Sequence, residues 1–142
     1  MASAPPPPGP RPAFVMPRDA QGWPDFGPPV RGSLAAWRAA HPHAVVCNVR
    51  GRTDLTDADF AHLAGVRAVD MSECSQATIT DAAFVHLRGV HTLHMTGCRQ
   101  ATITDAAFVH LRGVHTLDMS ECRQPTITSA GLHAALGFEP GR

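Results

Sequence analysis

The sequence predicts an α/β fold, a short repeat solenoid with parallel strands on its concave face and short helices on its convex face. The first observation is an internal repeat, because residues 76–93 (QATITDAAFVHLRGVHTL) recur letter for letter at residues 100–117. The second is that apolar residues continue at the same period of 24 residues on both sides of this pair. Periods of roughly 20–29 residues are typical of stacks in which each unit supplies one strand and one helix.

Columns of apolar residues, one period apart, define the predicted core. They are Phe60, Phe84, Phe108 and Leu132; Leu63, Leu87 and Leu111; Val66, Val90 and Val114; Val69, Leu93 and Leu117; and Met71, Met95 and Met119. A single unit buries little apolar surface, whereas stacked units form one continuous core. We therefore expect Phe84 to lie against Phe108, and Leu93 to pair with Leu117.

Residues 1–32 open the chain and hold ten of its thirteen prolines. Because this segment offers few large apolar side chains to bury, we expect a disordered, Pro-rich arm. As an alternative, Pro5–Pro8 fits a P-x-x-P ligand for a groove lined by aromatic residues. The solenoid is predicted to occupy residues 33–142, with a helical cap at residues 33–41 followed by about four 24-residue repeats.

The strand of each unit is predicted from alternating apolar residues, such as Leu93 and Met95. Two periods earlier, Val45 and Cys47 occupy the corresponding positions, which predicts a degenerate first strand. In this register Arg50 stands where later units have a cysteine.

The helix of each unit is predicted from its capping residues and its apolar spacing. Thr104 is a candidate N-cap, and Asp105 would lie at the positive end of the helix. Phe108 and Leu111 are three residues apart and so share a helical face, and Gly113 supplies a left-handed stop. The last unit, from Ile127, shows no dedicated cap after it, which leaves the C-terminal repeat open to self-association.

The composition is that of a soluble globular protein, because twelve arginines balance twelve acidic residues. There is no lysine, which excludes Schiff-base chemistry and a P-loop lysine. No catalytic triad order or phosphate-binding loop is present, so we expect no enzymatic activity and no cofactor. We expect no membrane or nucleic-acid partner and an intracellular, cytoplasmic location.

The four cysteines are interpreted as structural. Cys74, Cys98 and Cys122 recur once per unit, and Cys47 falls in the predicted first strand. Two disulfides are the alternative, but side chains on parallel strands about 4.8 Å apart do not present disulfide geometry. No pair has the C-x-x-C or C-x-x-H spacing of a zinc site.

The strand face is the surface that this architecture offers for binding. Its columns are Ala68, Thr92 and Thr116; Asp70, His94 and Asp118; and Ser72, Thr96 and Ser120. Asp70, His94 and Asp118 would stand side by side, where the two carboxylates favour a charged imidazole. Pairing of opposite charges along the ladder is one interpretation, and a metal site on these three residues is the alternative.

The pattern V-x-x-L-x-M-x-x-C followed by I-T-D-x-x-F-x-x-L resembles the cysteine-containing leucine-rich repeats, known from F-box/leucine-rich-repeat receptors of ubiquitin ligases. The match covers residues 45–137. It implies that the thiols of Cys74, Cys98 and Cys122 hydrogen-bond neighbouring backbone groups. The chain departs from the family in its longer loop after the cysteine and in having Phe in the helix, and no F-box pattern precedes the repeats.

We therefore predict a module that binds another protein through its concave strand face. The expected contact residues are Asp70, His94, Asp118, Thr92, Thr116, Ser72, Thr96 and Ser120, and the structural residues are Cys74, Cys98, Cys122, Phe60, Phe84, Phe108, Leu93 and Leu117. One alternative is a substrate-recognition fragment of an F-box-type ubiquitin ligase. The second is a metal site on Asp70, His94 and Asp118.

Overall fold

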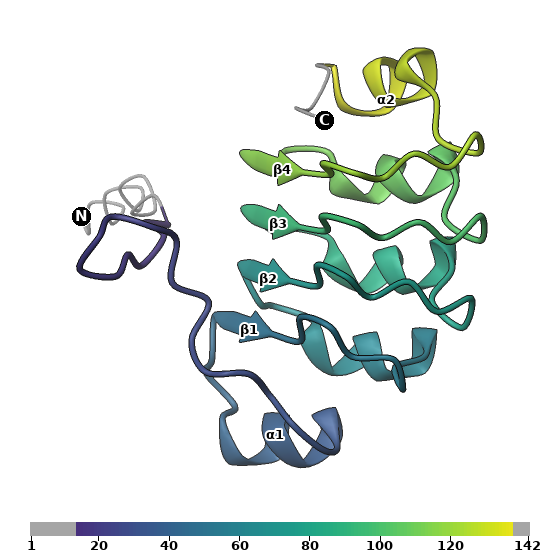
Figure 1. Ribbon diagram of the computed structural model, residues 1–142. Helices are drawn as coiled ribbons and strands as arrows, with labels where there is room; N and C mark the ends of the chain where they lie inside the picture. Colours follow the sequence, from purple (N-terminus) through teal and green to yellow (C-terminus); the bar gives the residue numbers. More distant parts are fainter. Residues whose placement is uncertain (1–13, 138–142) are drawn as a thin grey trace, which may run out of the picture.

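The computed structural model describes residues 14–137, so the Pro5–Pro8 motif and residues 138–142 lie outside the described part of the chain. The fold is α/β, with a four-stranded parallel sheet in the order β1-β2-β3-β4 (Figure 1). In chain order the elements are α1 (Leu34–Ala40), β1 (Val46–Asn48), η1 (Asp57–Leu63), β2 (Ala68–Asp70), η2 (Asp81–Leu87), β3 (Thr92–His94), η3 (Asp105–Leu111), β4 (Thr116–Asp118) and α2 (Ser129–Leu136). This arrangement is compatible with a repeat solenoid.

The strand register follows the sequence period over β2, β3 and β4. Val69 pairs with Leu93, and Leu93 pairs with Leu117, as predicted. At β1 the predicted register is wrong, because Cys47 pairs with Val69, 22 residues away instead of 24. The loop after β1 is therefore two residues shorter than the later loops, and Arg52 instead of Arg50 stands at the cysteine position.

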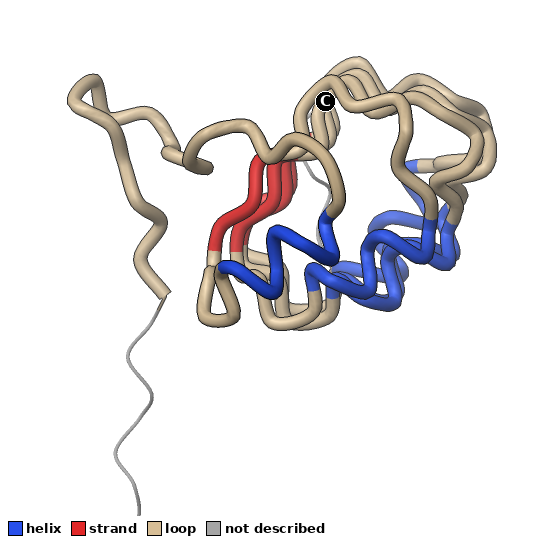
Figure 2. Tube along the Cα trace, turned by 90° about the horizontal axis from the view of Figure 1, so that it is seen from below, coloured by secondary structure: helices blue, strands red, loops and turns tan. Residues whose placement is uncertain are grey.

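The short helices η1, η2 and η3 are 3₁₀-helices and lie on one side of the sheet (Figure 2). A 3₁₀-helix has three residues per turn, so side chains three positions apart lie directly above one another. The spacing of Phe84 and Leu87 fits this geometry, and both side chains are buried in the core. Thr80 caps η2, because its hydroxyl oxygen accepts a hydrogen bond from the Ala82 amide.

The core is the stack of apolar columns between the sheet and the helices. Phe60, Phe84 and Phe108 have no exposed surface. The rings of Phe84 and Phe108 pack with their centroids 5.9 Å apart, so the predicted contact between identical positions of neighbouring units is present. At the start of the stack α1 packs against η1, and Arg38 donates hydrogen bonds to the carbonyls of His62 and Ala64.

The three repeated cysteines join each unit to the one before it. The thiols of Cys74, Cys98 and Cys122 donate to the backbone carbonyls of Val49, Met71 and Met95, at 3.2, 3.1 and 2.9 Å. All four cysteines are buried, and none is joined in a disulfide. Burial raises the pKa of Cys47 to about 12 and that of Cys74 to about 11, which keeps these thiols protonated and chemically inert.

A second connection between units, which sequence reasoning missed, lies at the helix starts. The carboxylate of Asp81 accepts hydrogen bonds from both the amide and the hydroxyl of Thr104, each at 2.6 Å. Asp57 accepts the same pair of bonds from Thr80, and Asp105 from Thr128. The sequence predicts each aspartate only as a favourable charge at the start of its own helix, yet each also bonds the threonine of the next unit.

Candidate interaction surface

The strand face is the side of the sheet that points away from η1, η2 and η3. The register places Asp70, His94 and Asp118 side by side on β2, β3 and β4. Asn48 on β1 completes this row, because it pairs with Asp70. Sequence reasoning missed Asn48, since the assumed period of 24 residues put Val46 in its place.

Exposure divides the eight predicted contact residues into two groups. Asp70, Ser72 and Thr92 are buried, with 7%, 1% and 4% of their surface exposed. Thr116 is exposed, and the other four have intermediate exposure: His94, Thr96, Asp118 and Ser120. The expectation that all eight are available to a partner is therefore wrong for the three buried residues, and the accessible part of the face lies over β3 and β4.

The N-terminal segment explains part of this difference. Residues 14–32, which we call the strap, run beside the strands (Figures 1 and 2). The ring of Phe26 packs on the imidazole of His94 with centroids 4.7 Å apart, and the ring of Phe14 packs on His91 at 5.2 Å. Met16 and Phe26 form a small buried cluster with Ala68 of β2.

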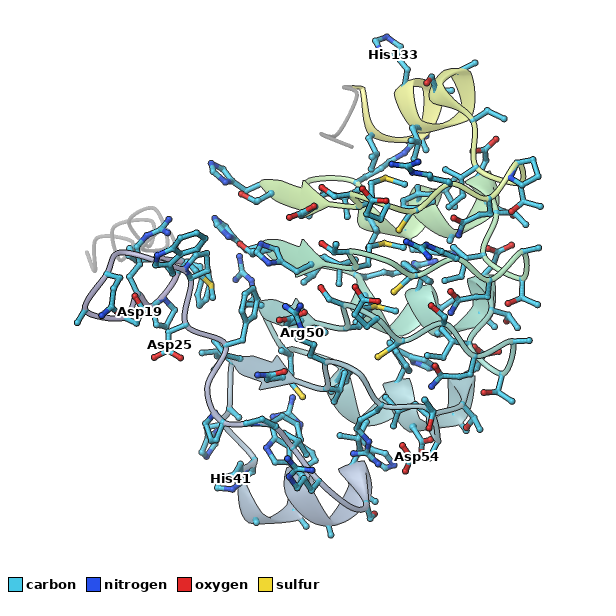
Figure 3. All side chains as sticks on the ribbon, viewed as in Figure 1. Asp19, Asp25, His41, Arg50, Asp54 and His133 are labelled. Atoms are coloured by element: carbon cyan, nitrogen blue, oxygen red, sulfur yellow. The ribbon has the colours of Figure 1, made fainter. Side chains whose placement is uncertain are left out.

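The strap corrects the prediction of a disordered arm for the residues that the structure describes. Phe26 is buried and Phe14 is half-buried against the sheet although prolines surround them, whereas Trp23 is exposed. A local turn shapes the strap, because the Asp19 carboxylate accepts hydrogen bonds from the amides of Gln21 and Trp23. Figure 3 shows Asp19 and Asp25 on this segment, beside the ends of the strands.

The strap is anchored to β1 by backbone and side-chain hydrogen bonds. The Val30 amide donates to the Asn48 carbonyl at 2.8 Å, and the Asn48 side-chain amide donates to the Gly27 carbonyl at 3.2 Å. Arg52 donates to the Val30 carbonyl from the loop that follows β1. Asn48, which the error in the predicted register concealed, is thus one of the residues that hold the strap.

The two aspartates of the row are engaged by their own chain. Asp70 accepts a hydrogen bond from the Ser72 amide at 3.0 Å, and Asp118 accepts from the Ser120 amide at 3.0 Å and the Ser120 hydroxyl at 2.7 Å. Burial acts to raise the pKa of Asp118, but these bonds from Ser120, with the charge of His94 and the Thr96 hydroxyl, outweigh it and leave the pKa below its usual value. Asp118 therefore carries a negative charge at neutral pH on the accessible part of the face.

His91 and His115 form a second column at the start of the strands. Their rings stack in parallel, with centroids 4.7 Å apart and 9° between the planes. Each ring hydrogen-bonds the hydroxyl of the next residue, Thr92 or Thr116, through Nδ1. Burial, followed by the charges of His115 and Arg67, lowers the pKa of His91.

The alternative of a metal site gains no geometric support. Within residues 14–137, no group of three or more His, Cys, Asp or Glu side chains is placed so that it could hold a metal ion, which argues against a metal site on Asp70, His94 and Asp118. Arg52 forms an ion pair with Asp54 at 2.7 Å in the loop after β1, and Arg123 forms one with Glu121 at 3.0 Å in the loop after β4.

No family model matches the chain, and no match to a curated protein was found. The resemblance to leucine-rich repeats therefore stays a prediction that rests on the repeat pattern. In the described part of the chain, no helix combines the length and the apolar character needed to cross a membrane.

Proposed function

We propose that the protein is a repeat solenoid of the leucine-rich-repeat type that binds another protein through its strand face. The constant register of β2, β3 and β4 and the thiol–carbonyl bonds between units support the architecture. In such a stack the strand face is the extended surface that is built from equivalent positions of successive units.

The observation that carries the proposal is the polar strip on β3, β4 and the turn after β4. Thr116 is exposed, the register partners His94 and Asp118 are partly exposed, and so is Ser120 in the turn after β4. Asp118 keeps its negative charge at neutral pH, since its pKa lies below the usual value. The strip combines this charge with hydroxyl groups and fits a partner that brings arginine or amide donors.

The proposal is tested by capture from native cell extract with a strand-face variant and a matched control. Thr116→Arg with Asp118→Asn places bulk at an exposed position and removes the charge. Arg112→Glu changes the charge of an exposed side chain just after η3 and serves as the control. We expect at least a tenfold loss of the partner with the strand-face variant and unchanged recovery with Arg112→Glu. Equal recovery from both variants would count against the proposed function.

A further inference from the structure

The strap covers one part of the strand face and leaves the other part open. Ala68 on β2 has no exposed surface and Thr92 on β3 has 4%, whereas Thr116, at the same position of β4, is exposed. These three residues are register partners, so each of them belongs to the same row of the face. The row is thus occupied over β2 and β3 by a segment of the protein's own chain.

The contacts of the strap resemble those of a bound peptide. Residues 14–26 reach the sheet through apolar and aromatic side chains, namely Phe14, Met16 and Phe26. Only a fraction of the strap's side chains takes part, since Val15 and Trp23 are 81% and 69% exposed. Extended segments that place a few anchor side chains on a sheet while others point to solvent are a common form of peptide recognition.

The hydrogen bonds between strap and sheet lie at the end of the strap that is close to β1. They join Gly27 and Val30 to Asn48. The earlier residues pack on the face by side chains, so they can leave it without breaking a strand ladder. A segment held in this way acts as a covalently tethered ligand, with an effective concentration on the order of millimolar for a short flexible connection.

We propose that the strap is an intramolecular competitor for the strand face, and that the partner of the proposed function presents an extended peptide with aromatic side chains that replaces Phe14 and Phe26. This inference rests on the proposed function. The aromatic preference follows from the surfaces that Phe14 and Phe26 cover, which include the imidazoles of His91 and His94, the side chain of Ala68 and the Arg67 guanidinium, 5.5 Å from the centre of the Phe14 ring. The arginine or amide donors of the same partner would reach Asp118 on the open part of the face.

The first test uses a labelled synthetic peptide of residues 14–27 (FVMPRDAQGWPDFG), titrated against the full chain. We expect saturable binding to a Phe14→Ala, Phe26→Ala variant, and at least tenfold weaker binding to the wild type, whose own strap competes. A peptide with Phe26→Ala should lose at least tenfold in affinity for the variant. The Trp23→Ala peptide is the matched control and should bind unchanged, because Trp23 is exposed on the strap.

Two outcomes of this titration would overturn the inference. One is that the peptide binds the variant no better than the wild type. The other is that the Trp23→Ala and Phe26→Ala peptides lose the same affinity. If the double variant lacks the cooperative thermal transition of the wild type, Asn48→Ala takes its place, since it removes the side-chain hydrogen bond from Asn48 to Gly27 of the strap and leaves the aromatic contacts intact. The peptide should again bind Asn48→Ala more tightly than the wild type, but by a smaller factor than it binds the double variant.

The second test separates this inference from the proposed function. The partner captured from extract should be recovered severalfold more with Phe14→Ala, Phe26→Ala than with the wild type, and excess peptide of residues 14–27 should displace it. A partner that is lost with Thr116→Arg, Asp118→Asn but is indifferent to the strap substitutions and to the peptide would leave the proposed function standing and overturn the competition. A partner unaffected by the strand-face variant would refute the proposed function itself.

Discussion

Residues 76–93 and 100–117 have the same sequence but not the same surroundings. Of their eighteen pairs of positions, fourteen share a burial class and four differ. His91 and Thr92 are more buried than His115 and Thr116, whereas Gln76 and Thr78 are more exposed than Gln100 and Thr102. Because the side chains are identical, each of these differences comes from what lies next to the copy in the fold.

Two neighbours of the first copy contribute to the four differences, and the second copy's strand, β4, is in addition an edge of the sheet, whereas β3 has a strand on both sides. The strap covers the strand of the first copy, where Phe14 packs on His91. The short loop after β1 lies beside the first copy's other end, and there Gln76 donates a long hydrogen bond of 3.4 Å to Leu55. Gln100 lies against a full-length loop and donates to the carbonyls of Cys74 and Gln76 at 2.8 and 3.2 Å. The two copies therefore differ in the exposure of side chains at their two ends, while their core side chains are equally buried.

Substitution of the core phenylalanines should lower the free energy of unfolding the most, and by the same amount in both copies of the repeat. Phe84→Ala and Phe108→Ala each remove a ring with no exposed surface, so each should lower the free energy of unfolding by about 3–5 kcal/mol. Urea denaturation measures both, with Val85→Ala and Val109→Ala as exposed controls that should change it by less than about 0.5 kcal/mol. Losses that differ by more than about 1 kcal/mol between the two Phe variants would show that the cores are not equivalent.

Substitution of the aspartates at the helix starts should lower the free energy of unfolding by an intermediate amount, which differs between the two copies. Asp81→Ala removes two partly buried hydrogen bonds from Thr104 and should lower the free energy of unfolding by about 1.5–3 kcal/mol. Asp105→Ala removes two solvent-exposed bonds from Thr128 and should lower it less. Chemical denaturation compares the two variants. The Thr104 hydroxyl also caps η3 by accepting from the Ala106 amide, so Thr104→Val should cost less in the Asp81→Ala background than in the wild type, and fully additive losses would argue against a direct connection.

Substitution of His91 or His115 should give the smallest effect, a change in how the melting temperature depends on pH. The pKa of His91 in the folded protein lies below its usual 6.5, because of burial and then the charges of His115 and Arg67. The folded state therefore binds this proton less readily than the unfolded chain, and the stabilisation present above pH 6.5 is lost as the pH falls. We expect His91→Gln to reduce the fall in melting temperature between pH 7 and pH 5, and His115→Gln to reduce it less. If the melting temperature of His91→Gln falls between pH 7 and pH 5 as much as that of the wild type, His91 is not the source of the pH dependence.

The register of the first strand shows where the pattern of the sequence is ambiguous. Side chains alternate with a period of two, so a shift of two residues keeps the same side chains on the inner face. Val45, Cys47 and Val49 alternate equally well in the predicted and the observed register. Alternation therefore predicted a strand correctly and could not detect the short loop that places Asn48 beside Asp70.

The strap shows a second limit of prediction from the sequence, which concerns where a Pro-rich segment lies in the fold. Its prolines predict an extended chain, and extended chain can either stay in solvent or lie on a surface with a few matching side chains. Which of these occurs depends on whether Phe14 and Phe26 meet a surface that fits them. That surface belongs to strands β2 and β3, more than forty residues further along the chain from either phenylalanine.

The sequence alone determined the period, the apolar columns and the alternation of the strands, because each of these depends on local spacing and on repetition of the same residues. It therefore predicted that Phe84 meets Phe108 and that Asp70, His94 and Asp118 share a row. Only the tertiary structure decided which residues of that row a partner could reach. Accessibility depends on a segment from elsewhere in the chain, and local spacing carries no information about where such a segment comes to lie.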